Sequence, residues 1–362
     1  VYDVIPLFEK HSSEEITGLL REKYSEEEIR EAVEEVAQLK KEGSLFTPDT
    51  YEAPLIDFKK RPTVVKALCL HIAHDCNLAC RYCFAEEGEY HGRRALMSYE
   101  TGKAALDFLI ANSGSRRNLE VDFFGGEPLM NFEVVKQLVA YGREQEKLHD
   151  KHFRFTLTTN GVLLNDDIME FANREMDNVV LSIDGRKEVH DHMRPFRKGA
   201  GSYDLIVPKF QKFAKSRNQE KYYVRGTYTH FNTDFSKDVL HLADLGFKQI
   251  SVEPVVAEET DDYAIKEEDL PVLFKEYDDL AAEMVRRNKA GNGFNFFHFM
   301  IDLEGGPCVY KRLPGCGSGT EYLAVTPWGD LYPCHQFVGN EKFLMGNVHD
   351  GVVNTGLQEE FK

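Results

Sequence analysis

Long apolar runs are missing from this 362-residue sequence, and basic residues are few relative to acidic ones. No apolar stretch approaches the roughly 20 residues that a membrane-spanning helix needs, so we expect no membrane partner. Lys and Arg number 44 against 61 Asp and Glu, which gives a net charge of −17. Clustered Lys and Arg bind nucleic-acid phosphates, so this acidic balance argues against a nucleic-acid partner. No signal peptide opens the chain, and we expect a cytoplasmic location.

Cysteine is also scarce, with seven residues, yet three of them fall in one short stretch. Cys76, Cys80 and Cys83 stand in "CNLACRYCF" with a C-x3-C-x2-C spacing and no fourth cysteine nearby. In a large chain expected in the cytoplasm, clustered cysteines are more often metal ligands or catalysts than disulfides. A structural zinc site takes four ligands, and an iron–sulfur cluster normally takes four thiolates. We interpret the missing ligand as an iron position left open for another molecule, with a zinc site as the alternative.

The first 46 residues predict a short helical unit. Ser12 and Ser25 each precede acidic residues, as capping residues do at helix starts. Gly43 marks a helix end, and a polar linker with prolines follows. We expect this unit and its linker to occupy residues 1–60.

Strand-like and helix-like segments alternate in the next region, which we place at residues 61–290. The predicted strands are residues 64–72, 119–124, 153–159, 178–184, 221–229 and 248–256. The predicted helices are residues 98–112, 131–148, 165–174, 202–216, 235–245 and 267–290. This alternation predicts an α/β fold with a parallel sheet and outer helices. Six units predict a partial (β/α)6, TIM-like barrel, with its functional loops at the carboxyl ends of the strands.

From about residue 291 the sequence becomes rich in glycine, aromatic residues and cysteine, which predicts a separate module at residues 291–362. The stretch "TPWGDLYPC" predicts a hairpin that turns at residues 328–330. The chain begins with Val1 in place of Met and ends at Lys362, so we expect it to be a piece of a longer protein.

The cysteine spacing, together with Tyr82 directly before Cys83, resembles the signature of the radical S-adenosylmethionine (SAM) superfamily. The resemblance implies a SAM-binding 4Fe-4S cluster on Cys76, Cys80 and Cys83, whose open iron binds the amino and carboxylate groups of SAM. Reductive cleavage of SAM then gives a 5′-deoxyadenosyl radical that abstracts a hydrogen atom. Cofactors carry this chemistry, so the resemblance implies no catalytic side chain beyond them.

Motifs after three successive predicted strands resemble the SAM-binding elements of that superfamily. "FFGGEP" resembles its GGE element, in which two glycines allow close backbone approach and the Glu accepts from the SAM amino group. "TLTTNG" and "LSIDG" end the next strands, and "HDHMRP" adds an Arg suited to a carboxylate. The SAM-binding residues that the resemblance implies are Tyr82, Gly125, Gly126, Glu127, Asn160, Ser182, Asp184 and Arg194. Taken singly, these motifs are also compatible with ordinary turns and a surface ion pair.

The second cysteine group resembles the start of the SPASM (or twitch) extension of radical SAM maturases. Cys316, Gly329 and Cys334 match its C-x9–15-G-x4-C spacing, and Cys308 matches an upstream ligand found in sulfatase-maturing enzymes. The resemblance implies an auxiliary 4Fe-4S cluster on Cys308, Cys316 and Cys334. No cysteine follows Cys334, so a second auxiliary cluster is expected only in the full-length protein. Three unrelated cysteines are the alternative.

The resemblance over residues 60–362 is closest to maturases of SCIFF (six-cysteines-in-forty-five) peptides, and the N-terminal helices resemble an incomplete winged-helix peptide-recognition element. It implies an enzyme that joins a cysteine sulfur to the backbone Cα, or the Cβ, of an acceptor residue in a ribosomally made, cysteine-rich precursor peptide with a leader. The implied electron donor is a flavodoxin or ferredoxin. His335 replaces the Asp of sulfatase maturases, which disfavours formylglycine formation. The alternatives are another SPASM-type maturase, which forms formylglycine or a carbon–carbon crosslink, and a non-catalytic iron–sulfur or zinc protein that binds peptides.

Overall fold

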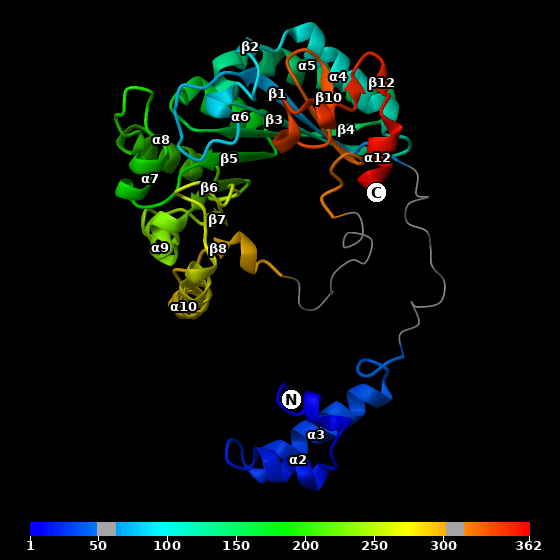
Figure 1. Cartoon of the computed structure of the whole chain (residues 1–362), viewed down its shortest axis with the longest axis vertical. Coiled ribbons are helices and arrows are strands. Elements are labelled where there is room, and N and C mark those ends of the chain that lie inside the picture. The colour runs from blue at the N-terminus through cyan, green and yellow to red at the C-terminus, as the bar shows by residue number, and fades with distance from the viewer. Residues whose placement is uncertain (49–62, 302–314) are drawn as a thin grey trace. The chain divides into compact units, whose positions relative to one another are not determined.

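The structure is a computed structural model that describes residues 1–48, 63–301 and 315–362 (Figure 1). The chain forms two compact units, Val1–Phe58 and Lys59–Lys362. None of the helices in the described ranges combines the length and the apolar character of a membrane span.

The N-terminal unit contains α1 (Ile5–Phe8), α2 (Ser13–Leu20) and α3 (Glu26–Lys41). The predicted helix starts are confirmed, because Ser12 and Ser25 each form a capping box with the Glu three residues later. Gly43, after α3, has a φ of +75°, a conformation that glycine adopts freely at helix ends. The helices enclose a small apolar core made of Val4, Ile16, Ile29, Val33 and Val36.

The larger unit is built on one twelve-stranded sheet. Its parallel strands are, in spatial order, β1 (Ala67–His74), β3 (Asn118–Gly125), β4 (His152–Thr159), β5 (Asn178–Ser182), β6 (Tyr222–Tyr228), β7 (Gln249–Pro254) and β8 (Asn295–Phe296). The first six coincide with the predicted strands, so the predicted partial barrel is confirmed. The two-residue strand β8 was not predicted. A short strand, β2 (Ala95–Leu96), pairs antiparallel with the end of β1.

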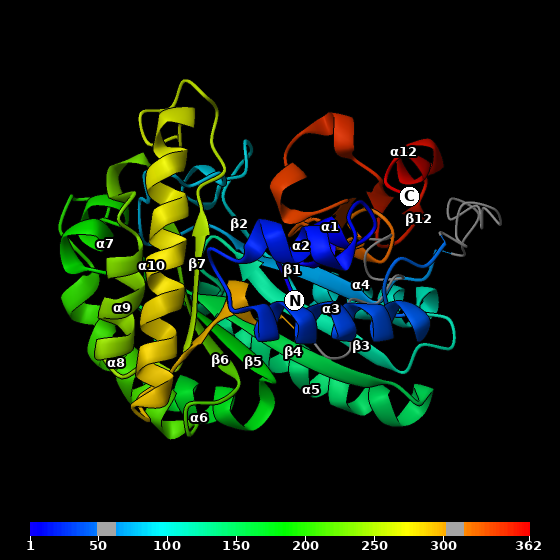
Figure 2. The ribbon, with the colours of Figure 1, turned by 90° about the horizontal axis from the view of Figure 1, so that it is seen from below.

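Helices cover one face of this sheet. They are α4 (Tyr99–Asn112), α5 (Phe132–His149), α6 (Asp166–Glu175), α8 (Tyr203–Ser216), α9 (Ser236–Asp244) and α10 (Leu270–Lys289), with the short α7 (Lys187–Met193) before α8. Figure 2 shows β3 to β7 side by side, with α5 and α6 along their lower side and α8, α9 and α10 on the left. Alternate strand residues such as Val121, Phe155 and Leu181 are fully buried in the main core. The positions between them on β3 to β6 carry several polar side chains, as expected for a parallel sheet whose second face lines a site.

The C-terminal segment continues the same sheet on the other side of β1. It contains β9 (Tyr322–Val325), β10 (Asp330–Tyr332), β11 (Gly346–Asn347), β12 (Gly351–Val352) and α12 (Thr355–Glu360). The predicted hairpin is confirmed, because β9 and β10 pair antiparallel around Gly329, whose φ is +90°. Strand β9 pairs in parallel with β1, with Cys69 opposite Ala324. Figure 1 shows β10 close to β1, so this segment lies beside the strand that leads into the cysteine loop.

Candidate active site

The three-cysteine loop leaves the carboxyl end of β1 and is tied to the chain around α7. The backbone N–H of Ala79 donates to the carbonyl of Pro195 at 2.9 Å, and that of Arg81 donates to the carbonyl of Met193 at the same distance. Cys76, Cys80 and Cys83 are all half-buried free thiols. The loop is therefore held at both the β1 end and the α7 end before any cofactor binds.

Two glycines at the end of β3 let the sheet backbone pass directly against this loop. A Cβ atom on Gly125 would lie 2.4 Å from the carbonyl oxygen of Ala73, and one on Gly126 would lie 2.1 Å from that of Asp75. Gly125 also has a φ of +124°, which an L-residue with a side chain rarely adopts. The glycines thus hold the start of the GGE element against the residues that precede Cys76.

Glu127 lies at the bottom of the site with its side chain fully buried. Its Oε1 accepts from the Thr159 hydroxyl at 2.8 Å and from the Leu129 N–H at 3.0 Å, and its Oε2 accepts from the Asn160 N–H at 2.8 Å. Burial raises the pKa of Glu127 to about 7, although these hydrogen bonds act in the opposite direction. The carboxyl group retains lone pairs that can accept from a bound ammonium.

Asn160 connects the end of β4 to the cysteine loop. Its side-chain amide lies 3.6 Å from the sulfur of Cys76 and donates to the Asn77 side chain at 2.8 Å. Glu127 and Asn160, which the sequence places on separate strand ends, are thus brought together next to the first cysteine.

Tyr82, Asp184 and Arg194 form a second group in which each residue contacts another. The Tyr82 hydroxyl donates to Asp184 at 2.8 Å, and the Arg194 Nε donates to Asp184 at 3.0 Å. The Thr227 N–H also donates to Asp184, which is fully buried. This group fastens the cysteine loop to the end of β5. Ser182 lies half-buried at that strand end, in register with Arg225 of β6.

The electrostatics of the loop favour a cationic partner for its sulfur atoms. Burial raises the pKa of Cys76 and of Cys80 to about 12, because desolvation disfavours the thiolate. Iron would offset that cost, since a coordinated thiol is deprotonated. Within the described ranges, no three His, Cys, Asp or Glu side chains converge as ligands of one metal ion would. A structural zinc takes four protein ligands, whereas three thiolates on a four-iron cluster leave one iron open, which is the donor set that this loop supplies.

The second cysteine group is described only in part, because Cys308 lies outside the described residues. Cys316 is exposed, and Cys334 is half-buried at the end of β10. The Cys334 sulfur lies 3.6 Å from Nδ1 of His335. The rings of Phe84 and His335, which directly follow Cys83 and Cys334, lie 5.6 Å apart. The structure thereby brings the C-terminal segment against the first cysteine loop.

Sequence reasoning missed a buried cluster between these two regions. His71 and His74 of β1 pack against Tyr90, with ring centroids 4.5 Å and 4.6 Å from the Tyr90 ring. The backbone of Gly339 approaches the carbonyl of Tyr90 so closely that a Cβ there would lie 2.0 Å from the oxygen. In the sequence the two histidines flank the cysteine loop, where His71 is expected to be a packing residue and His74 is a candidate to assist the loop. Tyr90 belongs to no motif, so the sequence offered no signal that the three rings meet.

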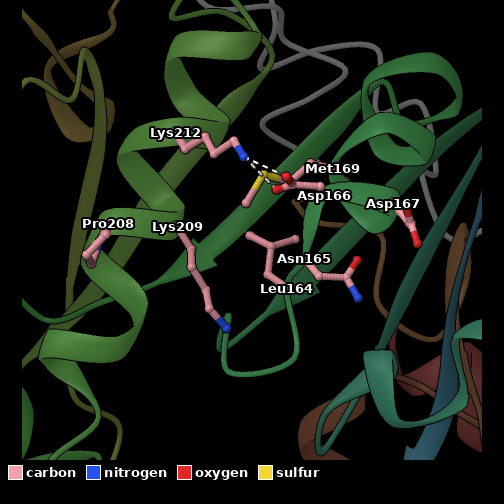
Figure 3. Close-up of a pocket in the computed structure, with 8 residues that line it drawn as sticks. All are labelled: Leu164, Asn165, Asp166, Asp167, Met169, Pro208, Lys209 and Lys212. Atoms are coloured by element: carbon pink, nitrogen blue, oxygen red, sulfur yellow. Dashed lines mark hydrogen bonds and ion pairs between the residues drawn. The ribbon is translucent and has the colours of Figure 1, made fainter.

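A cavity of about 670 Å³ lies elsewhere, between the start of α6 and α8 (Figure 3). Three of its four charged side chains have partners: Lys212 donates to Asp166 at 2.7 Å, and Lys209 donates to the carbonyl of Val162 at 2.6 Å. None of the cysteines lines it. We therefore place the candidate active site at the cysteine loop and the strand ends around it, because of their side chains, and not at this cavity.

The family described as the Radical SAM superfamily matches residues 70–246. The chain is 27% identical over 289 residues to an uncharacterised protein of Methanocaldococcus jannaschii, across 79% of this chain and 90% of that one. It is 25% identical over 293 residues to a cysteine-type anaerobic sulfatase-maturating enzyme of Clostridium perfringens, across 76% of this chain and 75% of that one.

Two solved structures share the fold. Native anSMEcpe with bound AdoMet and Cp18Cys peptide gives a TM-score of 0.67 at 20% identity, across 82% of both chains. Streptococcus suis SuiB bound to the precursor peptide SuiA gives a TM-score of 0.61 at 17% identity, across 94% of this chain and 71% of that one. At these identities the likeness concerns the arrangement of the strands and helices alone.

Proposed function

We propose that this chain is a radical SAM enzyme, as the match of that superfamily to residues 70–246 supports, and that it matures a cysteine-rich precursor peptide by forming a thioether. The observation that carries the proposal is the packing of the Cys334 segment against the Cys83 loop, with the Phe84 and His335 rings 5.6 Å apart. A thioether-forming enzyme needs a hydrogen-abstracting site and an electron acceptor close to one substrate, and this arrangement provides for both. The peptide ligands of anSMEcpe and SuiB support a peptide as the substrate class.

We assign the SAM-binding cluster to Cys76, Cys80 and Cys83, and SAM to the strand ends around it. Reductive cleavage of SAM is the chemistry that a cluster at this site supplies. Glu127 accepts a hydrogen bond from the SAM ammonium. Gly125 and Gly126 have no side chains, so they leave room for the amino-acid end of SAM. The other residues that we assign to SAM binding are Tyr82, Asn160, Ser182, Asp184 and Arg194. Because Tyr82 and Arg194 already contact Asp184, these three residues act as one unit that orients the loop.

The proposed reaction removes two hydrogens from the peptide. One leaves the acceptor carbon as a hydrogen atom and completes 5′-deoxyadenosine, and the other leaves the cysteine thiol as a proton. The carbon–sulfur bond then forms, and one electron must leave. Accepting that electron is what an auxiliary cluster on Cys316 and Cys334 supplies when bound; we assign Cys308 to it as well. A flavodoxin or ferredoxin in the cytoplasm is the electron donor that we propose for SAM cleavage.

A second candidate function is formylglycine formation, as in sulfatase maturation. The similarity to the Clostridium perfringens enzyme over most of both chains favours it. Against it stands His335, since the resemblance implies an Asp at this position in sulfatase maturases. Burial lowers the pKa of His335 to about 4, so this imidazole is a weak base at neutral pH.

Mass spectrometry of the peptide product separates the two functions. The anaerobically reconstituted full-length protein is incubated with SAM, a reductant and a cysteine-rich precursor peptide. A thioether product loses two hydrogens, keeps its sulfur and has one cysteine that no longer reacts with an alkylating agent. A formylglycine product has lost the cysteine sulfur. Formation of deoxyadenosine without any change to the peptide would contradict the maturase proposal. It would not contradict the assignment of the SAM-binding site.

A further inference from the structure

Four buried side-chain polar atoms have no hydrogen-bond partner in the described part of the chain, and three of them belong to one ring cluster beside the cysteine loop. The three are Nε2 of His71, Nδ1 of His74 and the hydroxyl of Tyr90, and the fourth is Nδ2 of Asn77 within the loop. His71, His74 and Tyr90 are 0%, 1% and 2% exposed, respectively. An unsatisfied buried polar atom costs free energy. Three such atoms in one cluster of packed side-chain rings point to a hydrogen-bonding group that binds there and that this structure does not contain.

The hydrogen-bond capacity of the cluster defines the chemistry of that group. Nδ1 of His71 and Nε2 of His74 lie 3.0 Å apart and share one proton. Whichever tautomers are present, a neutral pair then has one free N–H and one free acceptor nitrogen. The Tyr90 hydroxyl adds another donor. The cluster thus offers two donors and one acceptor nitrogen to its surroundings, and a group that only accepts hydrogen bonds satisfies the two donors.

The position of Tyr90 indicates which acceptor is available. Cys83 packs against the apolar cluster to which Tyr90 belongs. Tyr90 has a φ of +51°, and its neighbour His91 has a φ of +57°, a region that side chains such as these rarely adopt. The close approach of Gly339 to the Tyr90 carbonyl helps to maintain this backbone. The left-handed backbone at residues 90 and 91 therefore holds a buried tyrosine in the same apolar cluster that the third cysteine packs against.

We propose that the Tyr90 hydroxyl, positioned by His71 and His74, donates a hydrogen bond to a sulfur atom of the iron–sulfur cluster on Cys76, Cys80 and Cys83, and so raises its reduction potential. Thiolate and sulfide sulfurs accept hydrogen bonds, so they can satisfy the Tyr90 hydroxyl, which has no other partner among the described residues. Hydrogen bonds to cluster sulfurs set reduction potentials, because they stabilise the more negative, reduced state. The inference rests on the proposed assignment of the three cysteines to this cluster.

The test is an EPR-monitored redox titration of Tyr90→Phe, which removes only the hydroxyl. Both the parent and the variant carry Cys316→Ala and Cys334→Ala, so that the auxiliary cluster assigned to these cysteines does not contribute, and only the signal that SAM binding changes is followed. We expect the equilibrium constant for one-electron reduction to fall about tenfold, equivalent to about 59 mV. An exchangeable proton coupled to the cluster in the parent, detected by ENDOR in H2O and D2O, is expected to disappear in the variant.

The matched control is Tyr222→Phe on β6, a buried tyrosine whose hydroxyl is already bonded to the Lys248 N–H. It is expected to leave the potential unchanged. If Tyr90→Phe fails to hold iron, fluorotyrosine at position 90 tests the same point, since its more acidic hydroxyl is expected to raise the potential. An unchanged potential in the substituted protein, with the proton coupling retained, overturns the inference. A parent without any cluster signal would instead contradict the cysteine assignment.

Discussion

The two cysteine regions differ in how much the fold prepares them for a cofactor. The backbone of the first, residues 76–83, is tied to the chain around α7, and the residues just before it are tied to the glycine-rich end of β3. Burial raises the pKa of two of its thiols to about 12. In the second region Cys316 is exposed. Burial also raises the pKa of Cys334, whose sulfur is within reach of the Gln336 N–H at 3.5 Å.

This difference indicates that the two regions have different functions. A rigid, half-buried loop suits a cofactor whose geometry must be reproduced at every turnover, because misplacement of reacting atoms is costly. An exposed thiol suits a site that a substrate must reach. If the two regions are functionally separable, substitutions in each region affect different steps of the reaction.

Removal of the first cysteine set is expected to abolish SAM cleavage altogether. Cys76→Ala, Cys80→Ala and Cys83→Ala, combined in one protein, leave no ligand on the loop for the cluster. Deoxyadenosine production, measured by liquid chromatography under reducing conditions, is expected to fall to background while iron bound elsewhere is retained. Cys69→Ala is the matched control, because Cys69 is a buried residue of β1 in no predicted ligand set. Sustained cleavage in the triple variant would contradict the assignment.

Removal of the second cysteine set is expected to separate cleavage from peptide modification. With Cys316→Ala and Cys334→Ala the first loop keeps its backbone contacts, so SAM cleavage without a modified product is expected to continue. Crosslinked peptide, quantified by mass spectrometry, is expected to be lost. Both quantities are measured in the same reaction, so deoxyadenosine serves as the internal control. Full crosslinking by this variant would show that the two regions are not coupled in catalysis.

The sequence predicted the strand ends that carry the site residues better than the contacts between residues that are far apart in the chain. The strand ends that carry Gly126, Asn160 and Ser182 were predicted, because alternating strands and helices define them through local periodicity. The parallel pairing of β9 with β1 was not predicted, since a short strand carries no sign of a partner more than 200 residues away in a chain of this length. The contact between Tyr90 and Gly339 depends on that pairing and was missed with it.

Single residues illustrate the same limit. Tyr82, Asp184 and Arg194 were each predicted to bind SAM, but spacing along the chain does not reveal that they contact one another. Their mutual hydrogen bonds arise where α7 returns to the end of β5. Whether they also contact SAM stays a prediction, as does the role of Cys308.

The buried carboxyl of Glu127 is expected to make SAM binding depend on pH. Its pKa of about 7 means that it loses its proton only near neutrality. A SAM ammonium needs the carboxylate, so affinity is expected to rise as the pH increases and to level off above about 7. Folding stability should change in the opposite direction. The folded state keeps this proton up to about pH 7, but the unfolded state only up to its ordinary pKa of 4.5, so this contribution is lost as the pH rises between them.

Glu127→Gln is expected to weaken SAM binding by about tenfold, the scale of a hydrogen bond to a charged group, and to flatten both pH profiles. Calorimetric titration with SAM and thermal unfolding from about pH 5 to about pH 8 provide the two measurements. Glu133→Gln is the matched control, because that side chain is 80% exposed on the neighbouring helix. A pH profile that stays unchanged in Glu127→Gln would assign the titration to another group.

The smallest expected effect concerns the contact between the two regions. A methyl group at position 339 would lie 2.0 Å from the Tyr90 carbonyl oxygen, whereas one at Gly351 would meet no atom within 4 Å. Both glycines have positive φ, +90° and +79°, so Gly339→Ala and Gly351→Ala share the backbone cost. Their difference in unfolding free energy isolates the contact, and we expect Gly339→Ala to be less stable by about 1–3 kcal/mol. Equal stability would mean that the C-terminal segment is not fastened to the first cysteine loop at Tyr90. The segment would then be held beside the loop by other contacts, such as the pairing of β9 with β1.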